Sequence, residues 1–432
     1  MSVVAQRVAR ALQSRVARAF VHSSMQPPIL FDAVVFDLDG TLVATERFWI
    51  AAADRGARRA LAELGLTRAL PTPAEWLSMV GSPLAQGFER VFAELSASQR
   101  ARVMELCVEE EHVALRAGGA APMPGALETL AALHGQGLKL GIASNCSREY
   151  LETMLGGLGL ERWIDAARCL ESRGVASKAD MIAQLLEVFG TRAAVMVGDR
   201  ASDAAAAHAN AIPHVHLANG FAPRDEQVCA EAVLGDLHAL TALLQRRAQW
   251  IERALRELGM FERRGRAPTL GVTGRPGAGK TLFARDALRV LGAHGVEAVA
   301  LSLAGCSHSA GERSARGAEA AASASELERF AAGVLGPRAR GANIAAGPWG
   351  PAVPASSALV LEGCLPADPR LAQALTAVVE LSVSQPTALA RLAARSGAPC
   401  DDSPLVTDAR GGRALPEQTP RLVLPAENPL GG

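Results

Sequence analysis

Apolar residues along the chain gather in short runs that alternate with longer stretches of helical periodicity. Runs typical of buried strands occupy residues 33–39, 138–145, 193–199, 212–218, 269–274, 296–303, 357–363 and 376–383. Helical stretches lie between most of them, and strands that alternate with helices indicate parallel sheets covered on both faces. We therefore predict an α/β fold with two three-layer parallel-sheet domains.

The spacing of these runs sets the predicted domain boundaries. An almost uninterrupted helical stretch follows the first strand, which predicts a helical cap at about 46–120 inserted into a domain that spans 32–235. A charged amphipathic segment predicts a helical linker at 236–266. A second domain is then expected at 267–432, and its tail from about residue 396 is expected to be poorly ordered apart from residues 420–425.

The N-terminal segment and the overall charge bear on location and partners. The first 31 residues contain four arginines, several serines and no acidic residue. This composition is typical of a transit peptide for the mitochondrion or plastid, and the alternative is an arginine-rich arm of a cytoplasmic protein. No apolar run reaches the ~18 residues of a membrane-spanning helix, so we expect a soluble protein with no membrane partner. A formal net charge of zero argues against a nucleic-acid partner. The sequence carries no signal for an oligomeric state.

Two pairs of aspartates follow predicted strands. Asp37 and Asp39 end the first strand, and because residues i and i+2 of a strand point the same way, their side chains share one side. Asp199 and Asp203 follow the strand at 193–199, with a spacing of one helical turn. In an open parallel sheet, ligands bind at the carboxyl ends of the strands. The four carboxylates are therefore expected in one site.

Other polar groups follow the same strands. Thr41 comes just after the first acid pair, and Ser144 and Asn145 end the second strand. Lys178 is conspicuous because only three of the 44 basic residues are lysine, so a retained lysine indicates a position that needs a compact ammonium. Clustered carboxylates can stay ionised around Mg²⁺, which prefers oxygen ligands. One carboxylate could attack phosphorus, a second could exchange protons, and Lys178 could offset the phosphoryl charge.

The order of these motifs carries a family resemblance. DLDGTL, then SN, then a lone lysine, then GDRASD resemble the four motifs of the haloacid dehalogenase superfamily of phosphatases. Residues 32–222 are similar to its phosphoglycolate phosphatase and β-phosphoglucomutase branch. The resemblance implies a Rossmann-like core with an inserted helical cap, Mg²⁺ as cofactor and a small phosphorylated metabolite as partner. One departure is Ala44-Thr45, where relatives often carry Asp-Ser.

The resemblance also implies roles for individual residues. Asp37 matches the nucleophile and Asp39 the acid/base, whose backbone carbonyl joins the metal together with Asp199. Ser144 and Lys178 match phosphate-holding positions. The predicted site therefore consists of catalytic Asp37, Asp39, Ser144 and Lys178, phosphate-binding Thr41 and Asn145, and metal ligands Asp37, Asp39, Asp199 and Asp203.

A glycine-rich stretch follows the strand at 269–274. GRPGAGKT fits the phosphate-binding pattern GxxxxGK[ST], in which glycines expose backbone N–H groups, the lysine reaches the β/γ-phosphates and the hydroxyl residue binds Mg²⁺. Glu362 ends a later apolar strand, where a carboxylate suits a role at Mg²⁺. The predicted ATP-binding residues are Gly274, Gly277, Gly279, Lys280, Thr281 and Glu362.

This second half resembles the uridine kinase and phosphoribulokinase group of P-loop kinases over roughly 267–395. The resemblance implies an acceptor-activating aspartate after the second strand, but Ala304-Gly305 stands there and the first acid afterwards is Glu312. Arg391 and Arg395 are either lid arginines or part of a solvated helix face. Nucleotide binding is therefore expected, and kinase activity is left open.

Together these patterns predict a Mg²⁺-dependent phosphatase that acts on a small phosphorylated metabolite through an aspartyl-phosphate, fused to an ATP-binding domain. Phosphoglycolate-, sugar-phosphate- and nucleotide-like substrates are all compatible with the motifs, as is mutase action. The alternatives are a bifunctional phosphatase and nucleoside-like kinase, a phosphatase regulated by a nucleotide-binding pseudo-kinase domain, or a binding protein with neither activity.

Overall fold

The computed structural model describes residues 28–223, 225–262, 266–303, 324–363, 365, 368–396 and 419–425. Most of the predicted transit peptide and most of the predicted tail lie outside the described residues. The chain forms two compact units. One is Phe31–Leu243, and the other runs from Leu244 onward and includes the chain up to Leu30.

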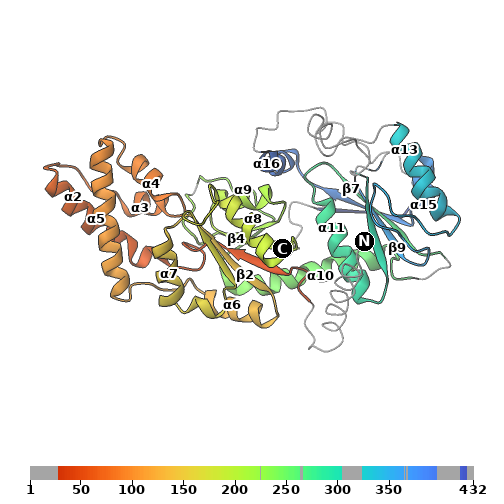
Figure 1. Ribbon diagram of the computed structural model, residues 1–432, viewed down its shortest axis with the longest axis horizontal. Helices are drawn as coiled ribbons and strands as arrows, with labels where there is room; N and C mark the ends of the chain where they lie inside the picture. The colour runs from red at the N-terminus through yellow and green to blue at the C-terminus, as the bar shows by residue number, and fades with distance from the viewer. Residues whose placement is uncertain are drawn as a thin grey trace. The chain divides into compact units, whose positions relative to one another are not determined.

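The first unit is built on a six-stranded parallel sheet in the order β3-β2-β1-β4-β5-β6 (Figure 1). Its strands are β1 (Ala33–Phe36), β2 (Lys139–Ser144), β3 (Ala166–Cys169), β4 (Ala194–Gly198), β5 (His214–Leu217) and β6 (Ala232–Leu234). The four predicted strands are confirmed. The two that the sequence pattern missed, β3 and β6, are the short strands at the two edges. The strand that leads to Asp37 is thus flanked by β2 and β4, whose ends carry Ser144 and Asp199.

Helices cover both faces of this sheet (Figure 1). They are α6 (Ala126–Gly135), α7 (Arg148–Gly157), α8 (Lys178–Phe189) and α9 (Ala201–Ala209), with the short 3₁₀ turns η2 (Leu160–Arg162) and η3 (Leu237–Ala239). Val35 and Met196 of the sheet share a buried core with Leu185 of α8 and Ala207 of α9. Helix α6 lies on the opposite side of the sheet from α8 and α9 (Figure 1).

The predicted cap is a separate group of helices that follows β1. It consists of the 3₁₀ turn η1 (Thr45–Arg47), α2 (Trp49–Glu63), α3 (Pro73–Met79), α4 (Leu84–Val91) and α5 (Ala97–Arg116). Helix α5 begins at a capping box in which Ser96 and Gln99 satisfy each other's backbone N–H groups. Helices α2 and α5 pack closely at Gly56, where a Cβ atom would lie 2.4 Å from the Cα of Cys107. Trp76 is fully buried, as expected of a cap-core residue.

The second unit has a five-stranded parallel sheet in the order β11-β10-β7-β9-β8. Its strands are β7 (Thr269–Gly274), β8 (Ala298–Ser302), β9 (Ala358–Glu362), β10 (Ala377–Ser382) and β11 (Arg421–Pro425). The first four were predicted, and β11 lies in the stretch at 420–425 that was expected to be ordered. The strand that leads into the glycine-rich loop, β7, is central and pairs directly with β9, which carries Glu362.

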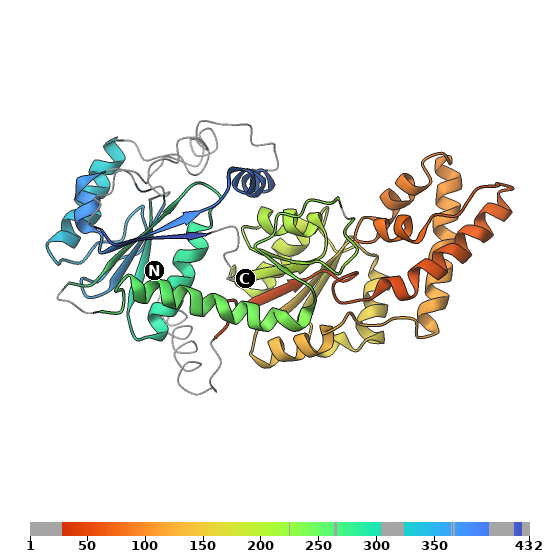
Figure 2. The same ribbon diagram turned by 180° about the vertical axis from the view of Figure 1, so that it is seen from behind.

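Two apolar cores cover the two faces of this second sheet. One contains Val272 and Val379 together with residues of α10 and α11, and the other contains Leu361 and Val378 together with α15 and the helical turn at 331–335. Figure 2 shows α11 and α15 on opposite sides of the strands. The helices are α10 (Leu240–Glu257), α11 (Lys280–Ala293), α13 (Ala324–Phe330), the π-helical turn η5 (Ala331–Leu335), α14 (Gly336–Ala339), α15 (Pro369–Ala374) and α16 (Gln385–Ser396).

Helix α10 lies in the segment predicted as a linker. Its residues Ile251 and Leu255 belong to the core of the second unit. Across the described residues, no helix combines the length and the apolar character that crossing a bilayer requires.

Candidate active site

Three buried carboxylates meet at the carboxyl end of the first sheet. Asp37 directly follows β1, Asp199 directly follows β4, and Asp203 lies in the first turn of α9. One oxygen atom from each of the three lies within 4.8 Å of the others, and each residue is at most 1% exposed. The strand order brings them together because β1 and β4 are neighbours in the sheet.

Lys178 lies between two of these carboxylates. It is the first residue of α8, and its Nζ is 2.9 Å from Oδ1 of Asp37 and 2.6 Å from Oδ1 of Asp203. Burial acts to lower the pKa of Lys178, but Asp203 and Asp37 outweigh burial and raise it above its ordinary value. The lysine is therefore a fixed positive charge at the site.

One lysine does not balance three buried carboxylates. Burial, partly offset by Lys178, raises the pKa of Asp37 well above its ordinary value, and burial followed by Asp203 raises the pKa of Asp199 to about 7. Asp37 Oδ2, Asp199 Oδ1 and Thr41 Oγ1 are buried and make no hydrogen bond within the described residues. Buried oxygen atoms without partners suit a hard cation with oxygen ligands, so the residues fit Mg²⁺.

The Asp39 carboxylate lies apart from this cluster and faces a cavity. Its Oδ1 accepts hydrogen bonds of 2.5 Å from the Thr45 hydroxyl and of 2.5 Å from the Tyr150 hydroxyl. Burial raises the pKa of Asp39, whereas the two hydroxyl groups act to lower it. Gly40 turns the chain directly after Asp39 with φ of +75°, and a Cβ there would lie 2.5 Å from Asp199 Oδ2. Glycine is therefore the residue that this turn accommodates.

The predicted phosphate-binding residues lie around the cluster in different ways. Thr41 and Ser144 are buried, at 0% and 2% exposure. Asn145 instead donates its Nδ2 hydrogen to the carbonyl of Gly81 at 3.0 Å, in a loop of the cap. The guanidinium of Arg200 also donates to this loop, at the carbonyl of Val80. These contacts hold the cap loop against the core of the same unit.

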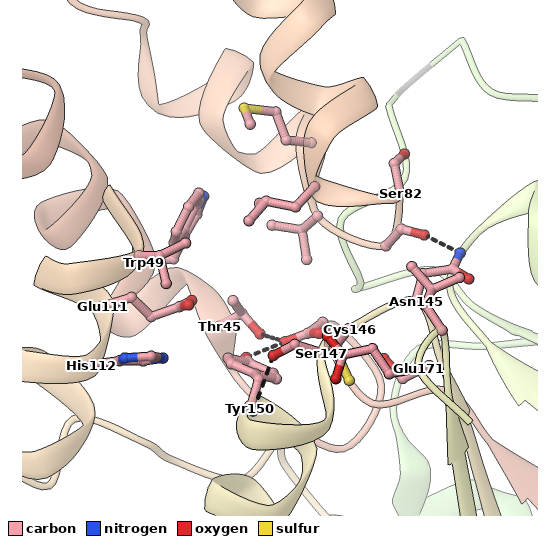
Figure 3. A pocket seen from close by; sticks show the side chains of 18 residues that line it. Thr45, Trp49, Ser82, Glu111, His112, Asn145, Cys146, Ser147, Tyr150 and Glu171 are labelled. Atoms are coloured by element: carbon pink, nitrogen blue, oxygen red, sulfur yellow. Dashed lines mark hydrogen bonds between the residues drawn. The ribbon is translucent and has the colours of Figure 1, made fainter. Parts of the chain in front are cut away.

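A cavity of about 300 Å³ extends from Asp39 between the cap and the core. Figure 3 shows Glu111 and His112, both from α5, on one side and Asn145 and Glu171 on the other. Apolar side chains of the cap, including Trp49, line part of its wall. A ligand here would have one end near Asp39 and its remaining atoms against the cap.

Sequence reasoning missed three residues of this site. Thr45 belongs to the departure Ala44-Thr45, and its hydroxyl proves to bond Asp39. Tyr150 lies on α7, 111 positions after its partner Asp39, and its signal is that it is the single tyrosine of the chain. Glu111 is buried within a helix rich in exposed glutamates, and burial followed by Asp39 raises its pKa to about 8. No local pattern distinguishes it from its neighbours.

The glycine-rich loop of the second unit forms another candidate site. Gly274, Gly277 and Gly279 all have positive φ, at 143°, 79° and 84°, and Lys280 begins α11. The Thr281 hydroxyl donates to Glu362 Oε2 at 3.1 Å, so the predicted pair lies together.

Two further predictions concern the surroundings of this loop. Arg391 is 4% exposed and donates to the Gly277 carbonyl at 3.1 Å, so it belongs to the loop's surroundings and is not part of a solvated face, whereas Arg395 is exposed. The positions of the absent base, Ala304-Gly305 and Glu312, lie outside the described residues.

Comparisons with known proteins match the first unit. A family model described as haloacid dehalogenase-like hydrolase matches residues 34–216. An uncharacterized protein of Lacticaseibacillus casei is 31% identical over 133 residues, which cover 31% of this chain and 58% of that protein. A plasmid-encoded phosphoglycolate phosphatase of Cupriavidus necator is 31% identical over 229 residues, which cover 49% of this chain and 92% of the relative.

A solved structure matches the same half. The crystal structure of a predicted phosphoglycolate phosphatase from Haemophilus somnus is 20% identical with a TM-score of 0.44, and the match covers 50% of this chain and 98% of that one. Through its N-terminal half, the chain belongs to the haloacid dehalogenase-like hydrolases, in their phosphoglycolate phosphatase-like branch, and is a phosphatase of that family.

Proposed function

We propose that the first unit is a Mg²⁺-dependent phosphatase that hydrolyses a small phosphorylated metabolite through an aspartyl-phosphate on Asp37. The observation that carries the proposal is the placement of Asp37 between Lys178 and the other buried carboxylates, at the carboxyl end of a central strand. A buried carboxylate beside a fixed ammonium can act as a nucleophile toward a phosphoryl group whose charge that ammonium offsets.

The reaction follows in two steps from the positions of two aspartates. A carboxylate oxygen of Asp37 attacks phosphorus while the bond from phosphorus to the leaving oxygen breaks, and Asp39 gives that oxygen its proton. Water then attacks phosphorus and gives its proton to Asp39, and the bond from phosphorus to Asp37 breaks to release inorganic phosphate. Thr45 and Tyr150 hold one oxygen of Asp39, which leaves the other to exchange the proton.

The same residues would hold the cofactor. Asp37, Asp199 and Asp203 supply carboxylate oxygens, and the backbone carbonyl of Asp39 is the further ligand that the family resemblance implies. When bound, Mg²⁺ supplies charge stabilisation to the phosphoryl oxygens. Lys178 and Thr41 would contact those oxygens from the protein side.

The test is phosphate release by the full chain from a panel of phosphate esters, with Mg²⁺ and with EDTA. We expect release from at least one ester with Mg²⁺, loss of release with EDTA, and recovery when excess Mg²⁺ is added back. Release that persists unchanged under chelation would contradict the metal assignment, and an inert panel would contradict the phosphatase. 2-Phosphoglycolate belongs in the panel because it is the substrate named for the Cupriavidus relative.

A second candidate function concerns the glycine-rich loop. We infer that it binds the phosphates of ATP, because three glycines at positive φ, a lysine at the start of α11 and the Thr281–Glu362 pair form one loop. The test is calorimetric titration of the full chain with ATP and Mg²⁺. Lys280→Ala is expected to weaken binding ~10-fold or more. ATP affinity that is absent, or equal in the two proteins, would contradict the assignment.

A further inference from the structure

The cavity beside Asp39 carries an unusual balance of charge for a site that handles phosphate esters. Asp39, Glu111 and Glu171 bring three carboxyl groups to its wall, and His112 brings one imidazole. Its 18 lining residues, all within the described part of the chain, include no lysine and no arginine. The Nδ1 atom of His112 lies 3.8 Å from a carboxylate oxygen of Glu149, which is not among the residues that line the cavity.

Among the residues of this wall, Glu111 is the one best placed to bind a ligand. It is 91% buried, since 9% of its surface is exposed, and its carboxyl group makes no hydrogen bond to the described residues. Figure 3 shows its side chain extending from α5 into the cavity, on the side opposite Asn145. A buried polar group that lacks a protein partner is costly unless a ligand or water satisfies it.

The position of Glu111 fixes which part of a substrate it would meet. Asp39 gives its proton to the leaving oxygen, so the leaving group must begin at Asp39 and continue into the cavity. Glu111 comes from the cap, and the nearness of its charge to Asp39 is one cause of its raised pKa. The atoms of the leaving group that extend from Asp39 toward the cap are therefore the ones that can reach Glu111.

From this geometry we propose that Glu111 selects a neutral, hydroxyl-bearing leaving group and that the cavity excludes the carboxylate of 2-phosphoglycolate. The proposal rests on the phosphatase function proposed above and names its substrate class. A carboxylate in the cavity would lose its hydration with no lysine or arginine among the lining residues to balance its charge, whereas a hydroxyl can both donate to and accept from Glu111.

A hydroxyl is favoured over an ammonium by the other groups in the wall. Burial raises the pKa of Glu111 to about 8, so at pH 7 the group is a neutral acid that donates as well as accepts. Ser147, Asn145 and His112 also line the cavity and can donate hydrogen bonds. An ammonium group cannot accept a hydrogen bond from these donors, whereas the oxygen of a hydroxyl group can.

The experiment compares three esters of nearly equal size on the full chain: 2-hydroxyethyl phosphate, 2-aminoethyl phosphate and 2-phosphoglycolate. We expect kcat/KM for 2-hydroxyethyl phosphate to exceed that for 2-phosphoglycolate ~10-fold or more. Glu111→Ala is expected to reduce this ratio ~10-fold, and Glu111→Gln, which keeps hydrogen-bonding capacity, is expected to retain most of it. Melting curves establish that both variants fold.

Glu110→Ala is the matched control. Glu110 is the preceding residue of α5, it pairs with Arg55 and Arg59 on the surface, and it does not line the cavity. Its replacement should leave the ratio between the esters unchanged. Equal or faster turnover of 2-phosphoglycolate or of 2-aminoethyl phosphate would overturn the proposal, as would a ratio that Glu111→Ala does not move. If none of the three esters, nor any other in the wider panel, releases phosphate, the phosphatase proposal itself fails, and this inference with it.

Discussion

The two units of this protein each present a buried lysine at the start of a helix that follows a strand, yet the two lysines meet different neighbours. Lys178 lies within 3 Å of two carboxylates, Asp37 and Asp203. Lys280 donates to a backbone carbonyl, that of Arg275, at 3.1 Å, and the nearby acid Glu362 is bonded by Thr281. The first lysine therefore belongs to a set of charges that can carry out a reaction, and the second belongs to a loop that can hold phosphate.

The difference explains why the two halves support conclusions of different depth. In the first unit, the proposed nucleophile, acid/base, counter-charge and metal ligands lie at the ends of neighbouring strands. In the second unit, the described residues supply the glycine-rich loop proposed to bind phosphate and a carboxylate, and the positions expected for an acceptor-activating base lie outside them. A loop of this kind supports a proposal of binding, whereas a proposal of catalysis requires the remaining groups as well.

The proposed difference between the two units is tested most directly at Asp37. Asp37→Asn removes the proposed nucleophile without changing the volume of the side chain, and we expect kcat to fall at least ~10³-fold. Far-UV circular dichroism and the melting temperature should show a folded protein, since the amide relieves repulsion among buried acids. Turnover near the wild-type rate in a folded variant would remove Asp37 from the reaction.

Lys178 provides a second test of this difference, because the exposed Lys139 offers a matched control. Lys178→Met leaves Asp37 and Asp203 buried without their counter-charge, and breaking a buried pair typically costs about 3–5 kcal/mol. Lys139→Met removes an exposed pair with Asp165, which contributes about 1 kcal/mol or less. Urea unfolding in EDTA measures both changes. Equal losses for the two variants would show that Lys178 is not the electrostatic centre of the cluster.

Tyr150 tests how Asp39 is positioned. Tyr150→Phe removes one of the two hydroxyl groups that bond Asp39 Oδ1, and a hydrogen bond to a charged group contributes about 1.5–3 kcal/mol. We expect kcat to fall ~10-fold with little change in KM. A double-mutant cycle with Thr45→Val should reveal coupling, because both side chains bond the same oxygen atom. Strictly additive effects would indicate that Tyr150 acts only by packing.

The last prediction is a dependence of stability on pH at Glu111. Its pKa is about 8 in the folded protein against an ordinary value of 4.5, so the folded state holds a proton that the unfolded state releases between these values. Stability contributed by Glu111 is therefore full below pH 4.5 and is lost as the pH rises toward 8. Relative to wild type, Glu111→Gln should raise the free energy of unfolding more at pH 9 than at pH 5, by about 4 kcal/mol at most, and melting curves at the two pH values check the sign.

Glu110→Gln is the control for that measurement, and its shift has the opposite sign. Arg55 and Arg59 lower the pKa of Glu110, so its contribution to stability is present above its ordinary value and lost as the pH falls. Its replacement should slightly lower the melting temperature at pH 9. A Glu111→Gln variant that behaves like Glu110→Gln would mean that the carboxyl of Glu111 is not buried in the folded protein.

Central strands of the sheets could be predicted from the sequence, whereas two short edge strands could not. Central strands such as β1 and β4 are covered on both faces, so they appear as continuous apolar runs. The edge strand β3, with the sequence AARC, is half-buried over three of its four residues, and β6 has only three residues. Neither is long or apolar enough to produce a pattern, and each forms because a neighbouring strand offers it a partner.

The residues of the site also differ in whether the sequence could predict them. Asp37, Asp199 and Lys178 lie at element ends, where topology alone brings them together, and strand order suffices to predict their meeting. Tyr150 and Glu111 reach the site from the interiors of α7 and α5, so their contribution depends on how the helices pack on the core. That information is not local in sequence. The rarity of tyrosine was the one available signal.

The central claim, that Asp37 accepts the phosphoryl group, is tested most directly by trapping the intermediate. The full chain is quenched during turnover of the ester that releases phosphate fastest with Mg²⁺, acyl phosphates are reduced with borohydride, and the reduced residue is located by mass spectrometry. The structure predicts reduction at Asp37, and no reduction when substrate is left out. Phosphate release accompanied by an unmodified Asp37, or by reduction at another carboxylate, would contradict it.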